Sequence, residues 1–284
     1  TGETDFTATE VAGRIETLVS AAAMERLREA ARRERAPDDL LKLPDRDLLA
    51  ALGLIRNGRL LRAGVFLAGT TDAIRAQFPG YAWTHLRMSS DVDYSDRADG
   101  QEALIVALER MLDRIMADNP ITTVPQGLFH FEIRTYPEIA LREALLNAFV
   151  HADYRMHGPI MVKQFMRRIE ISNPGGLPGG ITPQNILRHT PVPRNPALVD
   201  ALTRLRLVNR SNLGVRRMYQ SLLIEGKEPP QILDEGEAVR VLLRASDLSV
   251  PFRLFVAAEA DRGAMLGVEQ LLILQHLLRH PEID

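Results

Sequence analysis

Residues 137–173 read PEIALREALLNAFVHADYRMHGPIMVKQFMRRIEISN, and the interpretation of the whole chain starts from this stretch. Its first half has helical character and is apolar on nearly every side, which predicts a buried helix. The exceptions are Arg142, Glu143, Asn147 and His151, and the last three are spaced by four residues, so they share one helix face. A buried carboxylate or amide costs on the order of several kcal/mol unless a partner satisfies it. These groups therefore bind either one another and nearby backbone, or a ligand.

The composition is that of an ordinary folded protein long enough for two domains. Of its 284 residues 45% are hydrophobic and 25% are charged, with a formal net charge of −2 that gives no nucleic-acid signal. The absence of cysteine excludes disulfides, thiolate zinc sites and cysteine nucleophiles. No apolar run reaches the length of a membrane span and no signal peptide opens the chain, so we expect a cytoplasmic protein without a membrane partner.

Strand and helix signals alternate irregularly along the chain. Residues 54–69 predict a β-hairpin around an Asn57-Gly58 turn, and 81–88 predict a further strand. The central helix is followed by a predicted strand pair at 159–172, and residues 230–243 predict a closing hairpin. The irregular mixture predicts an α+β fold with helices packed on a mixed or antiparallel sheet.

Three segments carry a resemblance to a known family. REALLNAFVHADY (142–154), RIEISNPGGLP (168–178) and RNPALVDALTRLRLV (194–208) resemble a bacterial family labelled as the C-terminal region of an ATP-dependent DNA helicase RecG. That family is a divergent branch of the GHKL ATPases (gyrase, chaperone, histidine kinase and MutL type). Upstream, LGLIRNGRLLRAGVFLAG (52–69) resembles the segment that follows a Schlafen/AlbA-like DNA-binding domain in the same proteins. The resemblance implies a GHKL-type sandwich and a fragment of a longer transcriptional regulator.

The resemblance also implies roles for the polar residues of the helix. Glu143 and Asn147 match the Glu-x-x-x-Asn motif in which the glutamate activates the attacking water and the asparagine ligates Mg²⁺ of the bound ATP. The spacing suits this chemistry, because the two groups lie one helical turn apart and Mg²⁺ prefers oxygen ligands. The alternative is a structural pair that caps neighbouring loops. The resemblance places His151 among the residues expected to bind the cofactor. His151 also matches the family's turn from helix to strand, which we expect Asp153 and Tyr154 to hold.

Two glycine segments complete the implied ATP site. Asn173, Gly175, Gly176 and Gly179 match the first glycine box, although related ATPases carry aspartate where this chain has Asn173. An asparagine oxygen can still accept a hydrogen bond from an adenine amine, but without the assistance of charge. These glycines equally suit a tight turn that needs positive φ and no ligand. The second glycine box keeps only Gly214, and the sequence holds no P-loop, so we reject helicase activity.

Residues 194–217 leave two interpretations open. Arg194 and Asn195 precede a predicted helix and suit either helix capping beside a surface arginine, or a contact with a phosphate or lid. The arginines from Arg204 to Arg217 face either solvent, or DNA or another partner.

The domain organisation that we predict has four parts. They are a helical remnant of an upstream domain at 1–57, an α/β connecting segment at 58–136, the ATPase-like domain at 137–245, and a linker with a terminal helix at 246–284 that starts a winged helix.

Three functional hypotheses follow from these patterns. The first is a regulator fragment that binds ATP and Mg²⁺, acts at most as a weak ATPase, and couples nucleotide binding to homo-oligomer formation or to DNA binding by the full-length protein. The second is a scaffold for protein interaction or dimerisation that has lost nucleotide binding. The third is direct DNA binding by this fragment through its arginines and terminal helix.

Overall fold

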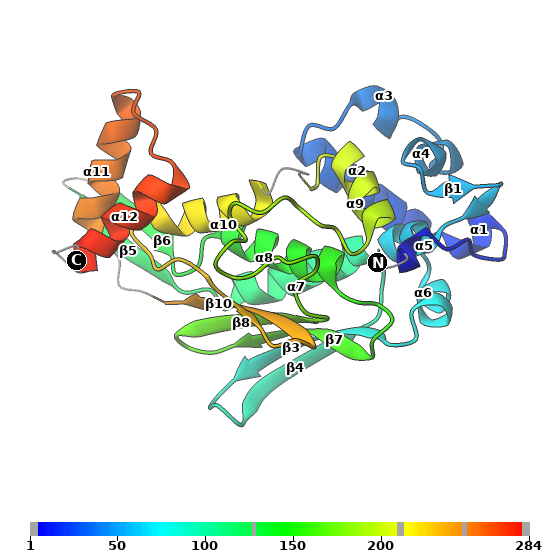
Figure 1. Cartoon of the computed structure of the whole chain (residues 1–284), viewed down its shortest axis with the longest axis horizontal. Helices are drawn as coiled ribbons and strands as arrows, with labels where there is room; N and C mark the ends of the chain where they lie inside the picture. Colours follow the sequence, from blue (N-terminus) through cyan, green and yellow to red (C-terminus); the bar gives the residue numbers. More distant parts are fainter. Residues whose placement is uncertain (1–4, 127–128, 209–212, 246–248, 280–284) are drawn as a thin grey trace.

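The computed structural model describes residues 5–126, 129–208, 213–245 and 249–279. Its central element is a six-stranded sheet, and helices lie along one face of it (Figure 1). Strands β7 and β8 alternate more buried with less buried residues, the pattern expected when one sheet face packs against a core. The fold is therefore α+β with helices on a mixed sheet, as predicted.

The order of strands in the sheet is β4-β3-β7-β8-β10-β9. The strands are β3 Tyr81–Met88, β4 Tyr94–Gly100, β7 Gly158–Gln164, β8 Arg168–Pro174, β9 Gln231–Asp234 and β10 Ala238–Arg244. Strands β3 and β7 run parallel, with Tyr81 opposite Gly158, whereas the other neighbouring pairs are antiparallel. The strands predicted at 81–88, 159–172 and 230–243 are confirmed.

Four helices follow β4 and surround the later strands in the sequence, and one of them, α9, contacts the N-terminal helices rather than the sheet. They are α7 Leu104–Ala117, α8 Glu138–His151, α9 Pro196–Arg204 and α10 Leu213–Leu223. Helix α8 packs on β8, α7 and α10, so it lies in the middle of the helical layer (Figure 1). This position explains why α8 is apolar on nearly every side.

The described residues before β3 are mostly helical. Their elements are η1 Phe6–Ala8, α1 Ile15–Leu18, α2 Ala21–Arg33, α3 Asp38–Leu41, α4 Asp45–Ala51, β1 Ile55–Arg56, β2 Arg59–Leu60, α5 Arg62–Ala68 and α6 Thr71–Gln77. The hairpin predicted at 54–69 is correct at its turn, where Asn57 and Gly58 both have positive φ. It is wrong beyond Leu60, because the second predicted strand is helix α5. Residues 63–68 are buried on all sides, so their pattern could not distinguish a strand from a helix.

A second hairpin and two helices complete the described chain. Strands β5 Ile121–Gln126 and β6 Phe129–Arg134 pair with each other, while α11 Val250–Asp261 and α12 Val268–Arg279 follow the sheet. Helix α12 confirms the predicted terminal helix, whereas α11 was not predicted. The winged helix and the four-part domain division stay predictions. Strand β3 of segment 58–136 pairs with β7 of segment 137–245, so one sheet joins these two segments.

Candidate functional site

Helix α8 provides the first side of the candidate site. It follows Pro137, whose backbone is extended and which takes the N-cap position of the helix. Its buried apolar residues are Ala140, Leu141, Ala144, Leu145, Leu146, Ala148, Phe149 and Val150. Glu143 is buried among them, whereas Asn147 and His151 are half-buried along the same face of the helix. The polar stripe predicted from the spacing therefore exists.

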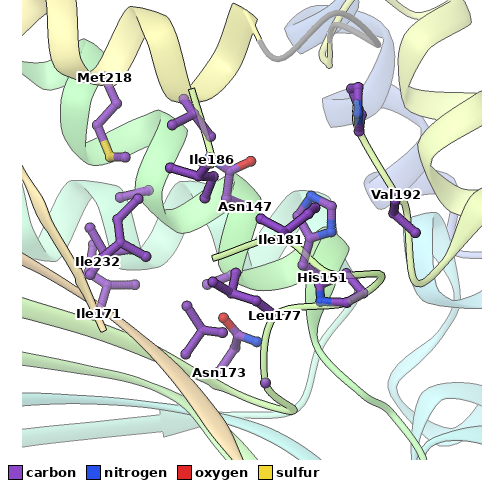
Figure 2. Close-up of a pocket in the computed structure, with 18 residues that line it drawn as sticks. Asn147, His151, Ile171, Asn173, Leu177, Ile181, Ile186, Val192, Met218 and Ile232 are labelled. Atoms are coloured by element: carbon purple, nitrogen blue, oxygen red, sulfur yellow. The ribbon is translucent and has the colours of Figure 1, made fainter. Parts of the chain in front are cut away.

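A cavity lies against this face, between α8, the sheet, α10 and the loop 175–195. It holds about 760 Å³ of open space, solvent at its mouth included. Asn147 and His151 line it from α8, and Asn173 lines it from β8 (Figure 2). The apolar lining residues are Ala144, Ala148, Ile171, Leu177, Pro178, Ile181, Ile186, Pro191, Val192, Val215, Met218, Ile232, Val239 and Val241. A mostly apolar cavity with a few convergent polar groups is the usual form of a small-molecule site.

One end of the cavity, here called the β8 end, consists of Asn173, Gly175, Gly176 and His151. Asn173 is buried near the end of β8, and its side-chain amide donates to the Pro174 carbonyl at 3.0 Å. With its N–H group so engaged, the amide oxygen is the group that remains to accept a hydrogen bond from a ligand.

Arg194 holds the base of the loop at the β8 end. Its Nη2 donates to the Gly176 carbonyl at 2.9 Å, and its Nη1 lies 4.0 Å from the Asp153 carboxylate. Gly175 has a φ of +89°, and a Cβ added there would lie 1.7 Å from Arg194 Nη1. The glycine is therefore required both by its backbone conformation and by the packing of the arginine.

Asn195 ties the other end of the same loop to α8. Its buried side-chain amide donates to the carbonyls of Val150 and Ala152, both at 2.9 Å. These carbonyls belong to the last turn of α8, where backbone acceptors lack helical partners. Asn195 makes no capping bond to its own helix, α9, so the capping interpretation is wrong for its side chain. A contact of Arg194 with a phosphate or lid stays a prediction.

The helix-to-strand turn after α8 has the predicted supports. Tyr154 donates its hydroxyl to the carbonyl of Phe149, and the Asp153 N–H donates to the Pro174 carbonyl at 2.9 Å. These contacts confirm that Asp153 and Tyr154 hold the turn.

The other end of the cavity, here called the α10 end, is lined by Asn147 of α8, with Gly214 of α10 and Glu143 beside it. A Cβ added to Gly214 would lie 2.7 Å from Glu143 Oε2 and 3.9 Å from Asn147 Oδ1. The first turn of α10 thus approaches both polar groups closely, and a side chain at position 214 would displace the end of the Glu143 side chain. Arg217, one turn further along α10, places its Nη1 4.0 Å from Glu143 Oε1.

The Glu143 carboxyl group has an altered acidity. Burial raises its pKa, and the positive charges of Arg142 and Arg217 only partly oppose this effect. A carboxylate with a raised pKa beside a cavity is a common feature of groups that accept or donate protons near neutral pH.

The His151 ring is held neutral at the β8 end. Burial and, to a smaller extent, the charge of Arg194 lower its pKa to about 4. Its Nδ1 is enclosed and has no hydrogen-bond partner among the described residues. A buried ring nitrogen without a partner is costly, so this atom suits a hydrogen bond to a ligand in the cavity.

The structure brings most of the predicted site residues together. Those that line the cavity are Asn147, His151, Asn173 and Gly176, and those that adjoin its α10 end are Glu143 and Gly214. Gly175 does not line the cavity and packs against Arg194. Gly179 is exposed, and a Cβ there would meet Val192 at 2.9 Å, so it serves the loop rather than the cavity wall. The binding roles of all these residues stay predictions.

The apolar part of the lining was not predicted. Leu177, Ile181, Ile186 and Val192 reach the cavity from a loop (Figure 2). The available signal was a set of branched apolar residues in a segment without regular structure, where polar residues are the norm.

The described residues lack two features, a metal-binding cluster and a membrane-spanning helix. Within 5–126, 129–208, 213–245 and 249–279, no three His, Asp or Glu side chains cluster in a way that could hold a metal ion. Among the described helices, none combines the length and the apolar character that a membrane span requires.

The fold and the site together define a class of protein. A mixed sheet covered on one face by helices, with a Glu-x-x-x-Asn stripe facing a glycine turn across a cavity, is consistent with a GHKL-like sandwich. Residues 157–243 match the family described as "Putative ATP-dependent DNA helicase recG C-terminal". The resemblance drawn from the sequence is confirmed over these residues, which support an ATPase-like, nucleotide-binding domain.

The fold is also similar to a solved structure. The DIP2311 protein from Corynebacterium diphtheriae superimposes with a TM-score of 0.77 at 26% sequence identity. The match covers 91% of this chain and 52% of that protein, so the chain spans about half the length of the structure it resembles. No protein with a curated description matches the chain.

Proposed function

We propose that this chain is the nucleotide-binding part of a cytoplasmic regulator and that it binds ATP with Mg²⁺ in the cavity beside α8. The observation that carries the proposal is the approach of Gly214 to Glu143 and Asn147 at the α10 end. Two sequence motifs that are far apart in the chain meet there, and the third, at Asn173 and Gly176, lines the same cavity at its β8 end.

The residues at the two ends of the cavity suit the two parts of ATP. The β8 end offers the Asn173 oxygen as an acceptor for the adenine amine, and the apolar walls suit a planar base. The α10 end offers the first turn of an eleven-residue helix, whose N–H groups favour phosphate. Because Gly214 has no side chain, this helix turn can lie close to Asn147.

Asn147 and Glu143 suit the metal and the reaction. Asn147 carries an amide oxygen that can ligate Mg²⁺, and bound Mg²⁺ supplies charge neutralisation for the triphosphate. Glu143 lies one turn earlier and is placed to take a proton from the water that attacks the terminal phosphorus, with ADP as the leaving group. The raised pKa of Glu143 supports this role, and we propose slow hydrolysis at most.

The second candidate function is a scaffold that no longer binds nucleotide. It is favoured by the ion pair of Arg217 with Glu143 and by the apolar side chains that the loop 175–195 places in the cavity. In this case Glu143 and Asn147 serve the stability of the fold alone.

Regulation is proposed for the longer protein. The chain spans about half of the protein that it resembles in structure, so DNA-binding parts would lie largely outside it. Nucleotide binding would then change homo-oligomer formation or the position of those parts. Direct DNA binding by this fragment is less well supported, because Arg204 bonds to the Ala51 carbonyl and Arg216 pairs with Glu269 within the protein.

Thermal unfolding with and without Mg-ATP tests the proposal. At a ligand concentration 100 times the dissociation constant the native state gains about 2.7 kcal/mol, which corresponds to a rise in Tm on the order of 5 °C for a chain of this size. Asn147→Ala should abolish the rise, whereas Gln184→Ala, an exposed amide of the loop, should keep it. An unchanged Tm of the wild-type protein at saturating Mg-ATP would favour the scaffold instead.

A further inference from the structure

The charge partner of Glu143 suggests a role that the nucleotide motifs do not assign. Glu143 keeps 9% of its side chain exposed, and its carboxylate lies 4.0 Å from the guanidinium of Arg217, whose side chain is 49% exposed. This distance exceeds that of a hydrogen bond, so the pair is electrostatic only. Arg217 is thus a weakly held cation with room to move.

The other arginines near the α10 end are already committed. Arg142 pairs with Glu34 at 2.9 Å, on the side of α8 that faces α2. Arg216 donates to the Leu187 carbonyl at 3.2 Å and to both carboxylate oxygens of Glu269 at 2.8 Å. Among these three, Arg217 is the one whose partner is the candidate base itself.

The position of Arg217 on α10 directs it to the same space as Gly214. Residues three apart on a helix are neighbours on its surface, so Gly214 and Arg217 share one face of α10. That face meets Glu143, as the contacts of both residues with its two oxygens show. A phosphate chain that passes Gly214 towards Glu143 therefore approaches the guanidinium of Arg217.

A polar hollow lies beside the contact of Arg217 with Glu143, and Arg217 lines it. The hollow holds about 510 Å³ of open space and is lined by Glu34, Thr203, Arg206, Val208 and Arg217. Arg217 therefore lies between Glu143 and an open polar space, with about half of its side chain exposed.

We propose that Arg217 is the residue that distinguishes a triphosphate from a diphosphate: it neutralises Glu143 in the empty site and binds the terminal phosphate of ATP when the nucleotide enters. This inference rests on the proposed function. The guanidinium offers a planar set of donors that matches two phosphate oxygens at once. When the guanidinium moves from Glu143 to the phosphate, the Glu143 carboxylate is left without its ion-pair partner beside the terminal phosphate.

The strengths of the two interactions favour the transfer. A half-exposed ion pair without a hydrogen bond contributes at most about fivefold to an equilibrium constant. Charge-assisted hydrogen bonds to phosphate typically contribute about tenfold or more. The terminal phosphate is therefore the stronger partner.

Calorimetric titration of the whole chain with Mg-ATP and Mg-ADP tests this inference. Arg217→Ala should weaken ATP binding about tenfold and change ADP binding less than twofold. Arg217→Lys should recover part of the ATP affinity, because it keeps the charge and loses the paired donors. Arg240→Ala is the control, since Arg240 is a surface arginine that pairs with Glu170 and Glu235; it should change neither affinity.

A second variant tests whether the Arg217–Glu143 ion pair of the empty site competes with ligand binding. Glu143→Gln should strengthen ATP binding about two- to fivefold, because Arg217 no longer has a competing partner. The same substitution added to Arg217→Ala should have no such effect. The double variant also removes the buried charge that Arg217→Ala leaves without a partner, so it serves if the single variant folds poorly.

The outcomes distinguish the inference from the function on which it rests. If Arg217→Ala leaves ATP affinity unchanged, or weakens ATP and ADP binding equally, the nucleotide site stands and the role of Arg217 is wrong. If the wild-type chain binds neither nucleotide, the proposed function and this inference both fail.

Discussion

The two ends of the cavity are built in different ways, and their glycines show the difference. At the β8 end, a side chain on Gly175 would overlap the guanidinium of Arg194, and one on Gly176 would lie 2.5 Å from the Gly236 carbonyl. At the α10 end, the described atoms nearest to a side chain on Gly214 would be the ends of Glu143 and Asn147. The first end is held by contacts of the protein with itself, and the second by the residues proposed to act on a ligand.

This difference separates stability from binding. Substitutions at the β8 end should disturb the fold, because they act on packed backbone and on a buried arginine. Substitutions at the α10 end should disturb ligand binding, because the neighbouring side chains can move at little cost to the fold. Three experiments test the contrast, in order of decreasing effect.

The largest effect is expected for Gly175→Ala. Its positive φ and the overlap with Arg194 together predict a loss of about 4 kcal/mol in the free energy of unfolding. Gly236→Ala is the matched control, with a φ of +80° and no atom within 4 Å, and should lose only about 1 kcal/mol. Urea denaturation measures both values. Equal losses would show that Arg194 yields easily and that the β8 end is not rigid.

The second effect is a loss of stability at acidic pH. The pKa of His151 is about 4 in the folded protein and about 6.5 in the unfolded chain, so between these pH values only the unfolded state takes up the proton. Stability should therefore fall as the pH drops from 7 to 4, by about 2 kcal/mol when the partial solvent contact of the ring is allowed for.

Denaturation of His151→Asn across the same pH range measures this contribution. The variant should lose most of the slope, and the remainder should come in part from His85, whose pKa burial also lowers. An unchanged slope in the variant would mean that His151 titrates as an exposed ring does.

The smallest effect in free energy is expected for Gly214→Ala. The added methyl group takes space beside Glu143, so Mg-ATP affinity should fall about tenfold, which is about 1.4 kcal/mol. The free energy of unfolding should change by less than about 1 kcal/mol, because the carboxylate can rotate and alanine favours the helix. Adenosine, which lacks the phosphates, should bind both proteins equally in the same titration. A loss of stability as large as that of Gly175→Ala would remove the distinction between the two ends.

The sequence predicted those parts of the fold that carry a signal of sufficient length or period. The pair β7–β8 was found from its alternation, and helix α8 from the length of its apolar run and the four-residue spacing of its polar residues. Helix α5 was mistaken for a strand because all its core residues are buried and no period remains to be read. Helix α11 was missed altogether.

The candidate site was predicted only in its local parts. Glu143, Asn147 and His151 lie four residues apart on one helix, so their common face follows from helical geometry alone. Two contacts join residues from distant parts of the chain: the ion pair of Arg217 with Glu143 and the packing of Arg194 against Gly175. Such contacts depend on how elements pack, which no single-sequence pattern encodes.

The parallel pairing of β3 with β7 also bears on how this protein must be made. Tyr81 finds its partner Gly158 only after the residues between them have left the ribosome. A nascent chain that ends after α8 but before residue 158 would hold Trp83 and Phe149, both fully buried in the finished protein, without strands β7 to β10 of the sheet. Chaperone contact during this interval, and aggregation of products cut before residue 158, are the expected costs of pairing β3 with a strand from much later in the chain.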